Sequence, residues 1–184
     1  MEEFAAKHDV PIVGPAVGTL LQILARSIGA DRVFELGSAI GYSTAFFAQA
    51  VGRGGQVFYT DGDEANAQRA RDYLGRMNLL DRVTLRVGDA VTSLEATTGY
   101  FDVIFIDVDK EGYPQALQAA APRVRRGGYL LADNTLWSGK VVDAAVKDAA
   151  TEGVRRFNRS LFSLQEFRTV IVPLRDGVAI ARRE

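Results

Sequence analysis

The stretch Arg32–Ala50, RVFELGSAIGYSTAFFAQA, joins two different patterns at a turn that contains glycine. Arg32 to Leu36 is a short apolar run typical of a buried strand, whereas Gly41 to Ala50 has helical spacing. Further strand-like runs alternate with helical segments such as Glu64 to Met77. This alternation predicts a parallel sheet covered on both faces, because each right-handed crossover carries a helix back over the sheet.

Seven short runs have the composition expected of strands. They are Arg32 to Leu36, Gln56 to Thr60, Val83 to Val87, Phe101 to Ile106, Tyr129 to Ala132, Glu166 to Val172 and Val178 to Arg182. Only PLRDG, Pro173 to Gly177, separates the last two, which is too short for a helical crossover and predicts a hairpin. We therefore expect a doubly wound α/β fold. Its Rossmann-like sheet should have about seven strands, mostly parallel, with one antiparallel strand near the C-terminus.

The composition narrows the classes of function. Lys and Arg number 22 against 23 acidic residues, which gives no electrostatic reason to expect a nucleic acid or membrane partner. The absence of cysteine excludes disulfides and thiolate chemistry and is compatible with the cytoplasm, where we expect the protein to act. The only histidine is His8, near a terminus, so histidine triads and zinc sites are excluded.

Neither a linker nor a targeting segment is evident. No internal repeat or low-complexity tract divides the chain, so residues 1–184 are expected to form a single domain. The N-terminus lacks the basic and apolar regions of a signal peptide, and no apolar run approaches the length of a membrane span. We expect a soluble protein.

Each of the first five predicted strands ends near an acidic residue. In open parallel sheets, ligands bind outside the carboxyl ends of the strands, near the point where the strand order reverses. The residues collected at this edge are Glu35, Gly37, Gly41, Asp61, Asp63, Asp89, Asp107, Asp109, Asp133 and Asn134. This edge is therefore the predicted ligand site.

The glycine turn favours a nucleoside ligand. Gly37 permits a tight turn with close approach of a ligand, and Gly41 lets the following helix pack closely against the strand. Asp61, at the end of the next strand, can accept hydrogen bonds from a ribose diol. Ala39 stands where a dinucleotide site has its middle glycine, which favours S-adenosylmethionine over NAD. The alternative is a glycine turn with an incidental acid.

Two carboxylates are predicted to meet at neighbouring strand ends. One helical crossover joins the fourth and fifth strands, so Asp107 and Asp133 should lie roughly 5 Å apart. Their charges repel unless one is protonated or a cation lies between them. With Asn134 they form an all-oxygen set, which suits Mg or Ca. Alternatively, Asp133 caps the following segment and Asn134 adopts a turn conformation.

These residues lie in motifs that resemble the cation-dependent class I O-methyltransferases, which include caffeoyl-CoA and catechol O-methyltransferases. The motifs are ELGSAIGYST from Glu35, IDVDKEGY from Ile106 and GGYLLADNTLWSGKV from Gly127. The resemblance runs from about Gly14 to the C-terminus. It implies methyl transfer from S-adenosylmethionine to a hydroxyl of a small, catechol-like aromatic acceptor, assisted by a divalent cation.

The resemblance also assigns roles to individual residues. The implied cofactor-binding residues are Glu35, Gly37, Ser38 and Ser43 at the methionine and ribose end, Asp61 at the ribose hydroxyls, Asp89 and Ala90 beside the adenine, and Asp109. The implied metal ligands are Asp107, Asp133 and Asn134. Lys110 matches the lysine that acts as catalytic base, so Lys110 and Asp107 are the implied catalytic residues.

Alternatives remain open at several positions. Lys110 could instead be an exposed lysine paired with Glu111 or Asp109. Trp137 and Tyr113 could sandwich an aromatic acceptor or serve only in packing. The protein could also be a metal-independent methyltransferase of the same fold, or a module that binds S-adenosylmethionine without turnover.

The sequence departs from the family near its start. Members usually carry an additional N-terminal helical segment, and this chain has only about a dozen residues before the region of similarity. Val13 and Val17 stand where polar residues near the cofactor are expected. We expect a reduced lid over the acceptor, or one supplied by a partner subunit, and a homodimer.

Overall fold

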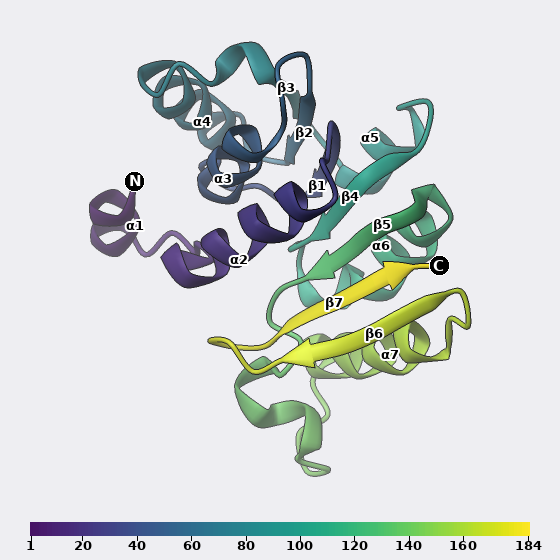
Figure 1. Ribbon diagram of the computed structural model, residues 1–184. Coiled ribbons are helices and arrows are strands. Elements are labelled where there is room, and N and C mark those ends of the chain that lie inside the picture. Colours follow the sequence, from purple (N-terminus) through teal and green to yellow (C-terminus); the bar gives the residue numbers. More distant parts are fainter.

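The computed structural model describes residues 1–184, whose strands form one mixed sheet in the order β3-β2-β1-β4-β5-β7-β6 (Figure 1). The strands are β1 Arg32–Leu36, β2 Gln56–Asp61, β3 Val83–Val87, β4 Phe101–Ile106, β5 Val124–Ala132, β6 Phe167–Val172 and β7 Val178–Arg183. Strand β7 pairs antiparallel with both β5 and β6, and the other pairings are parallel. The predicted sheet, its single antiparallel strand and the terminal hairpin are confirmed.

Strand β5 is the one strand whose predicted start is clearly wrong. It begins at Val124 rather than Tyr129 and passes through Gly127, which has a φ of 77°. The pairing of β4 with β5 shifts register between Phe101 and Val103. The segment VRRGG has no apolar alternation, so its first residues could not be identified as a strand from pattern alone.

Helices cover both faces of the sheet. The helices are α1 Glu2–His8, α2 Gly14–Ser27, α3 Tyr42–Ala50, α4 Glu64–Arg76, α5 Ala90–Glu95, α6 Tyr113–Ala120 and α7 Ala149–Ser163, with short 3-10 turns at η1 Leu80–Arg82, η2 Lys110–Gly112, η3 Ala121–Arg123 and η4 Trp137–Val142. Helices α2, α3 and α4 pack on one face of the sheet and α5, α6 and α7 on the other (Figure 1). The sheet is therefore the middle of three layers.

Alternate residues of each inner strand enter the two cores. Val33 and Phe105 point into the core under α2 to α4, whereas Phe34 and Ile104 point into the core under α5 to α7. All four side chains are fully buried. A strand that is buried on both faces reads as a continuous apolar run, which is why these strands were recognisable from sequence.

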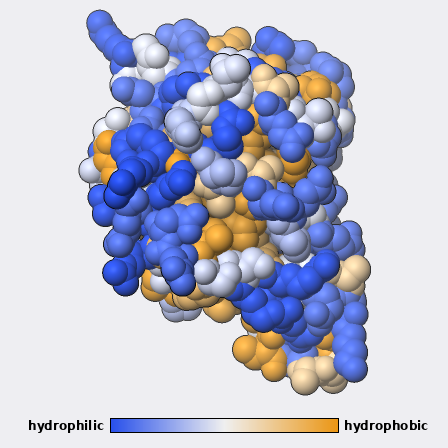
Figure 2. All heavy atoms as spheres, turned by 90° about the vertical axis from the view of Figure 1, so that its right-hand side faces the viewer, coloured by the Kyte–Doolittle hydropathy of each residue, from blue (hydrophilic) through white to orange (hydrophobic).

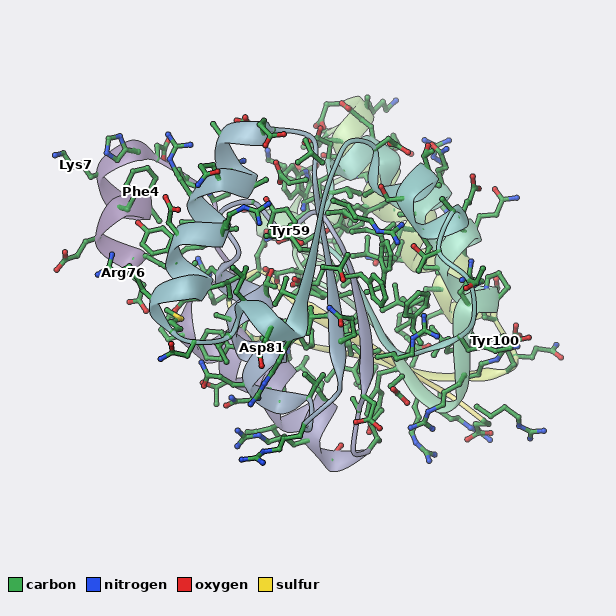
Figure 3. The ribbon with its side chains drawn as sticks, turned by 90° about the horizontal axis from the view of Figure 1, so that it is seen from above. Phe4, Lys7, Tyr59, Arg76, Asp81 and Tyr100 are labelled. Atoms are coloured by element: carbon green, nitrogen blue, oxygen red, sulfur yellow. The ribbon has the colours of Figure 1, made fainter.

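The N-terminal segment lies against the layer of α3 and α4. Phe4 of α1 faces α4 (Figure 3), where its ring lies 5.2 Å from the guanidinium carbon of Arg69. Glu2 accepts a hydrogen bond of 2.7 Å from the hydroxyl of Tyr42, at the start of α3. These contacts anchor the segment beside the carboxyl ends of β1 and β2.

The edge at which the parallel strands begin carries mostly hydrophilic side chains on its surface (Figure 2). The opposite edge, where these strands end, holds the predicted site. None of the helices has the length and apolar character needed for a membrane span.

Candidate active site

A cavity of about 1330 Å³ opens at the carboxyl ends of the parallel strands. Its walls come from the N-terminal segment, from the loops that follow β1 to β5 and from the turn between β6 and β7. The predicted site residues that line it are Gly37, Ser38, Ser43, Asp61, Asp89, Ala90, Asp107, Asp109, Lys110, Asp133 and Asn134. The topology therefore gathers residues from five separate loops into one site.

Glu35 is the predicted site residue that does not line the cavity. Its side chain is fully buried behind Ser38 and Ser43, which do line the cavity. Oε2 of Glu35 accepts hydrogen bonds from the hydroxyls of Ser38, at 3.3 Å, and Thr44, while Oε1 has no partner. Burial raises the pKa of Glu35 to about 7, although the hydroxyls of Thr44, Ser43 and Ser38 favour its charged form. Glu35 is thus placed to hold the serines rather than to touch a ligand directly.

The turn after β1 lies directly against the backbone of Asp107. Gly37 has a φ of 86°, and a Cβ atom there would overlap the carbonyl oxygen of Asp107. The amide of Asp107 also donates to the carbonyl oxygen of Leu36 at 2.8 Å. The predicted cofactor loop and the predicted metal site are therefore in backbone contact, and only glycine fits at position 37.

Ala39 occupies the left-handed region, with a φ of 43°, at the place where a dinucleotide site would have glycine. Its amide donates to Oδ2 of Asp61 at 2.9 Å, and its carbonyl oxygen accepts from the hydroxyl of Tyr59 at 2.6 Å. Oδ1 of Asp61 accepts from the amide of Asp63 and from the side chain of Asn66. Asp61 therefore organises the loop and also faces the cavity.

Gly41 has a different neighbour from the one predicted. Its φ is 80°, and a Cβ atom there would lie 2.9 Å from Cβ of Ala70 on α4. The close approach that requires glycine is therefore made by helix α4 and not by the strand.

Asp89 and Ala90 form the cavity wall after β3. Asp89 accepts a hydrogen bond of 2.7 Å from the amide of Thr92 and so caps helix α5. The amide and hydroxyl of Thr92 hold the pKa of Asp89 below its ordinary value. Asp109, after β4, also faces the cavity and is exposed.

Asp107 and Asp133 end neighbouring strands, as predicted, because β4 pairs with β5. The amide of Asp133 donates to the carbonyl oxygen of Ile106 at 3.3 Å, so the backbones remain paired up to the site. Asp133 is only 4% exposed, and its Oδ1 has no hydrogen-bond partner. Burial, and then the negative charge of Asp107, raise the pKa of Asp133 to about 6. The two carboxylates, Asp107 and Asp133, would therefore be stabilised in their charged forms by an additional cation.

Lys110 is not an exposed surface lysine. Its side chain is 11% exposed and forms an ion pair with Asp107 at 3.0 Å, rather than with Glu111 or Asp109. The same ammonium donates to the carbonyl oxygen of Val108 at 3.2 Å and to the hydroxyl of Tyr113 at 2.9 Å. All three ammonium hydrogens thus have acceptors.

The two aromatic residues considered for the acceptor differ in position. Tyr113 is fully buried, packs edge-on against Phe157 and does not line the cavity, so the packing interpretation is correct for it. Trp137 lines the cavity with its ring 5.8 Å from Nζ of Lys110, and its buried Nε1 has no partner.

Asp176 is a site residue that the sequence interpretation missed. Its carboxylate accepts hydrogen bonds from the side-chain amide of Asn134, at 3.4 Å, and from the amide of Ser138. Asn134 itself has the left-handed turn conformation considered from sequence, with a φ of 52°. Asp176 lies in the turn before β7, which runs antiparallel to β5 and so starts where β5 ends. The predicted hairpin was the available signal, but it did not indicate which strand β7 would pair with.

The N-terminal segment also contributes more than predicted. Residues between Glu2 and Ala16 line the cavity, including Val13, whereas Val17 belongs to the core. The structure has no group of three or more His, Cys, Asp or Glu side chains arranged to hold a metal ion. The predicted metal set contains two carboxylates and one amide, and so differs from such a group.

The chain resembles known methyltransferases along its whole length. The family model described as O-methyltransferase matches residues 1–184. A catechol O-methyltransferase of Niastella koreensis is 35% identical over 178 residues, covering 92% of this chain and 80% of the relative. A caffeoyl-CoA O-methyltransferase of Eucalyptus globulus is 28% identical over 196 residues, covering 100% of this chain and 80% of the relative.

Solved structures agree with this assignment. An O-methyltransferase from Bacillus cereus, crystallised in complex with SAH (S-adenosylhomocysteine), superposes with a TM-score of 0.91 at 30% identity, covering 99% of this chain and 88% of that one. The family inferred from the motifs at Glu35, Ile106 and Gly127 is thereby confirmed. The chain belongs to the O-methyltransferase family.

Proposed function

We propose that the protein transfers a methyl group from S-adenosylmethionine to a hydroxyl of a small, catechol-like aromatic acceptor, with a divalent cation bound at Asp107, Asp133 and Asn134. The observation that carries the proposal is the cluster of Lys110, Asp107 and Asp133, which shares one cavity with the glycine loop. The family assignment and the SAH complex of the Bacillus cereus relative support the cofactor.

The residues present fit a divalent cation. Asp133 has a buried carboxylate oxygen without a partner, and burial, followed by the negative charge of Asp107, raises its pKa. The all-oxygen set of Asp107, Asp133 and Asn134 suits magnesium or calcium. When bound there, such an ion would lower the pKa of a coordinated acceptor hydroxyl.

The remaining chemistry belongs to the chain itself. Methyl transfer from a sulfonium is an in-line displacement, so alignment of donor and acceptor is a large part of catalysis. The glycine loop and Asp61 bind and orient the nucleoside end of the cofactor. Lys110, at the strand end between the two predicted sites, is the proposed base. Its ammonium must first release a hydrogen, and the neutral amine then takes the proton of the acceptor hydroxyl. Trp137 supplies an aromatic wall for the acceptor.

One observation favours a metal-independent enzyme as a second candidate. The ammonium of Lys110 lies 3.0 Å from Asp107 and already compensates one of the two carboxylates. In that case, Lys110 alone would stabilise the acceptor oxyanion.

A single assay series separates the two candidates. Purified protein is incubated with labelled S-adenosylmethionine and a panel of catechols and hydroxycinnamoyl esters, in EDTA and then with added magnesium or calcium. We expect transfer to catechol-type acceptors that is lost in EDTA and restored by the ion. Full transfer in EDTA by metal-free protein would favour the second candidate. NAD binding without any response to S-adenosylhomocysteine would reject both.

We further propose that residues 1–184 form one domain that acts in the cytoplasm as a homodimer. One sheet containing all seven strands supports a single domain, and the near-neutral charge favours a small-molecule substrate over nucleic acid or a membrane. Light scattering coupled to size-exclusion chromatography tests the dimer, and a monomeric mass would reject it.

A further inference from the structure

Arg175 is a cationic residue of the cavity to which neither the motifs nor the proposed mechanism gives a role. It lies in the turn between β6 and β7, next to Asp176, and is exposed at the cavity wall. Its backbone is in the left-handed region, with a φ of 51°, which is uncommon for a residue other than glycine. The turn therefore directs a charged side chain toward the site from the C-terminal hairpin.

The N-terminal segment fixes the position of the guanidinium. Nη1 of Arg175 donates to the carbonyl oxygen of Ile12 at 2.9 Å. The guanidinium also lies across the backbone of Gly14, where a Cβ atom would be 2.7 Å from Nη1. This is its only hydrogen bond, so most of its five N–H donors remain available. The group is held in place with its remaining donors free.

The charges of the cavity make this guanidinium unusual. Nine carboxylate side chains and two cationic side chains line the cavity. Lys110 is already paired with Asp107, whereas Arg175 has no carboxylate within ion-pair distance. An anionic group on a bound molecule would be repelled by most of the cavity and attracted at this one position.

Arg175 lines the same cavity as both halves of the predicted site. The lining includes Asp133 of the proposed metal set and Ser43 of the predicted cofactor loop. Burial raises the pKa of Tyr42, beside Ser43, and the positive charge of Arg175 opposes this rise. A molecule that fills the cavity can therefore reach the guanidinium from either half.

We propose that Arg175 binds the carboxylate of a small molecule held in the cavity. A guanidinium presents paired donors that match the two oxygens of a carboxylate, and such charge-assisted bonds are the strong ones. The inference rests on the proposed function, which offers two sources of this group. One is the amino-acid carboxylate of the methyl donor, and the other is an acceptor that is a hydroxylated aromatic acid.

The test compares ligands that differ in the carboxylate, by calorimetry on the full chain with magnesium present. The cofactor pair is S-adenosylhomocysteine against 5′-methylthioadenosine, which lacks the amino-acid portion. The acceptor pair is 3,4-dihydroxybenzoate against catechol, added to protein saturated with S-adenosylhomocysteine. Each pair is measured for the parent, Arg175→Met and Arg175→Lys. Arg168→Met is the control, because Arg168 is 81% exposed on β6 and lies outside the cavity.

We expect Arg175→Met to weaken the carboxylated member of one pair by roughly 10- to 100-fold and to leave its partner within about 2-fold, with partial recovery in Arg175→Lys. The ligand pair that responds shows whether the carboxylate bound by Arg175 belongs to the cofactor or to the acceptor. Equal weakening of both members would mean that Arg175 only holds the N-terminal segment and would overturn the proposal, as would no change in either pair. All readouts are binding, so failure of methyl transfer would count against the proposed function and not against Arg175.

Discussion

The ammonium of Lys110 lies 2.9 Å from the hydroxyl oxygen of Tyr113, and that hydroxyl donates its hydrogen to the carbonyl oxygen of Asp133 at 2.9 Å. A phenol has one hydrogen to donate, so Tyr113 can only accept from Lys110. The directions of both hydrogen bonds are thus fixed: Lys110 donates to Tyr113, and Tyr113 donates to Asp133. Tyr113 ties the proposed base on the segment after β4 to the end of β5.

We predict that Tyr113→Phe lowers turnover by about 10-fold while cofactor affinity stays within about 2-fold, because Lys110 loses one of its three acceptors. Tyr59→Phe is the matched control, since it removes a buried hydroxyl that donates to Ala39 in the glycine loop. That change should weaken S-adenosylhomocysteine binding more than it alters turnover at saturating cofactor. Steady-state kinetics with calorimetry measure both, and identical profiles for the two variants would contradict the assignment.

Glu35 predicts a pH-dependent stability of the cofactor-free protein. Burial raises its folded pKa from 4.5 to about 7, so the folded state holds a proton that the unfolded state has already released. The stabilisation that protonated Glu35 gives to the folded state is therefore complete below pH 4.5 and is lost as the pH rises through 7. The full shift corresponds to roughly 3 kcal/mol.

Glu35→Gln should remove this dependence. We expect the free energy of unfolding of the parent, measured in EDTA without cofactor, to fall relative to that of the variant between pH 4.5 and 7 and to stay level above that range. Urea unfolding at pH 5, 6, 7 and 8 is the measurement. A constant difference between the two proteins across this series would show that Glu35 does not titrate in this range.

Close packing of α7 at Gly153 holds the backbone of Lys110 in position. A Cβ atom at Gly153 would overlap the carbonyl oxygen of Lys110, so α7 packs directly against η2. Gly153→Ala should lower stability by about 1–3 kcal/mol and should also lower turnover, because either the helix or Lys110 must move. Gly75→Ala is the control, since Gly75 lies in α4 with no atom near its Cβ position. It should be neutral or stabilising by up to about 1 kcal/mol. Normal turnover in Gly153→Ala would mean that α7 moves instead of Lys110.

The sequence pattern predicts where the strands end, but it does not predict which segments cover those ends. Phe101 to Ile106 reads as a strand because it is buried on both faces, and the topology rule then places Asp107 at the ligand edge. Asp176 and Arg175 reach the same cavity only because β7 inserts between β5 and β6. Hairpin spacing indicates that two strands pair, but it does not indicate the edge to which they add.

The sequence pattern also did not predict the surroundings of individual site residues such as Glu35 and Ala39. Glu35 reads as a cavity residue because it ends a strand, but its side chain turns into the interior behind Ser38 and Ser43. Ala39 was used only to favour S-adenosylmethionine over NAD, and the pattern did not show its left-handed backbone, which accompanies hydrogen bonds from its amide to Asp61 and from Tyr59 to its carbonyl oxygen. Such long-range contacts override the local preference of the residue.

The buried carboxylate of Asp133 should control how the protein responds to a divalent cation. This group has an oxygen without a partner and a pKa raised to about 6 by burial and by Asp107. Asp133→Asn keeps the shape of the side chain and removes one of two repelling charges, so it should stabilise the protein relative to the parent in EDTA. It should also remove the increase in melting temperature that magnesium or calcium gives the parent, since binding to the folded state alone stabilises it. Binding of S-adenosylhomocysteine should persist, because the proposed cofactor residues lie on other loops.

Asp63→Asn is the control for charge, as Asp63 lines the cavity but caps α4. An unchanged magnesium response in Asp133→Asn, with full methyl transfer by metal-free parent, would reject the metal site and leave Lys110 as the only positive charge at the two strand ends.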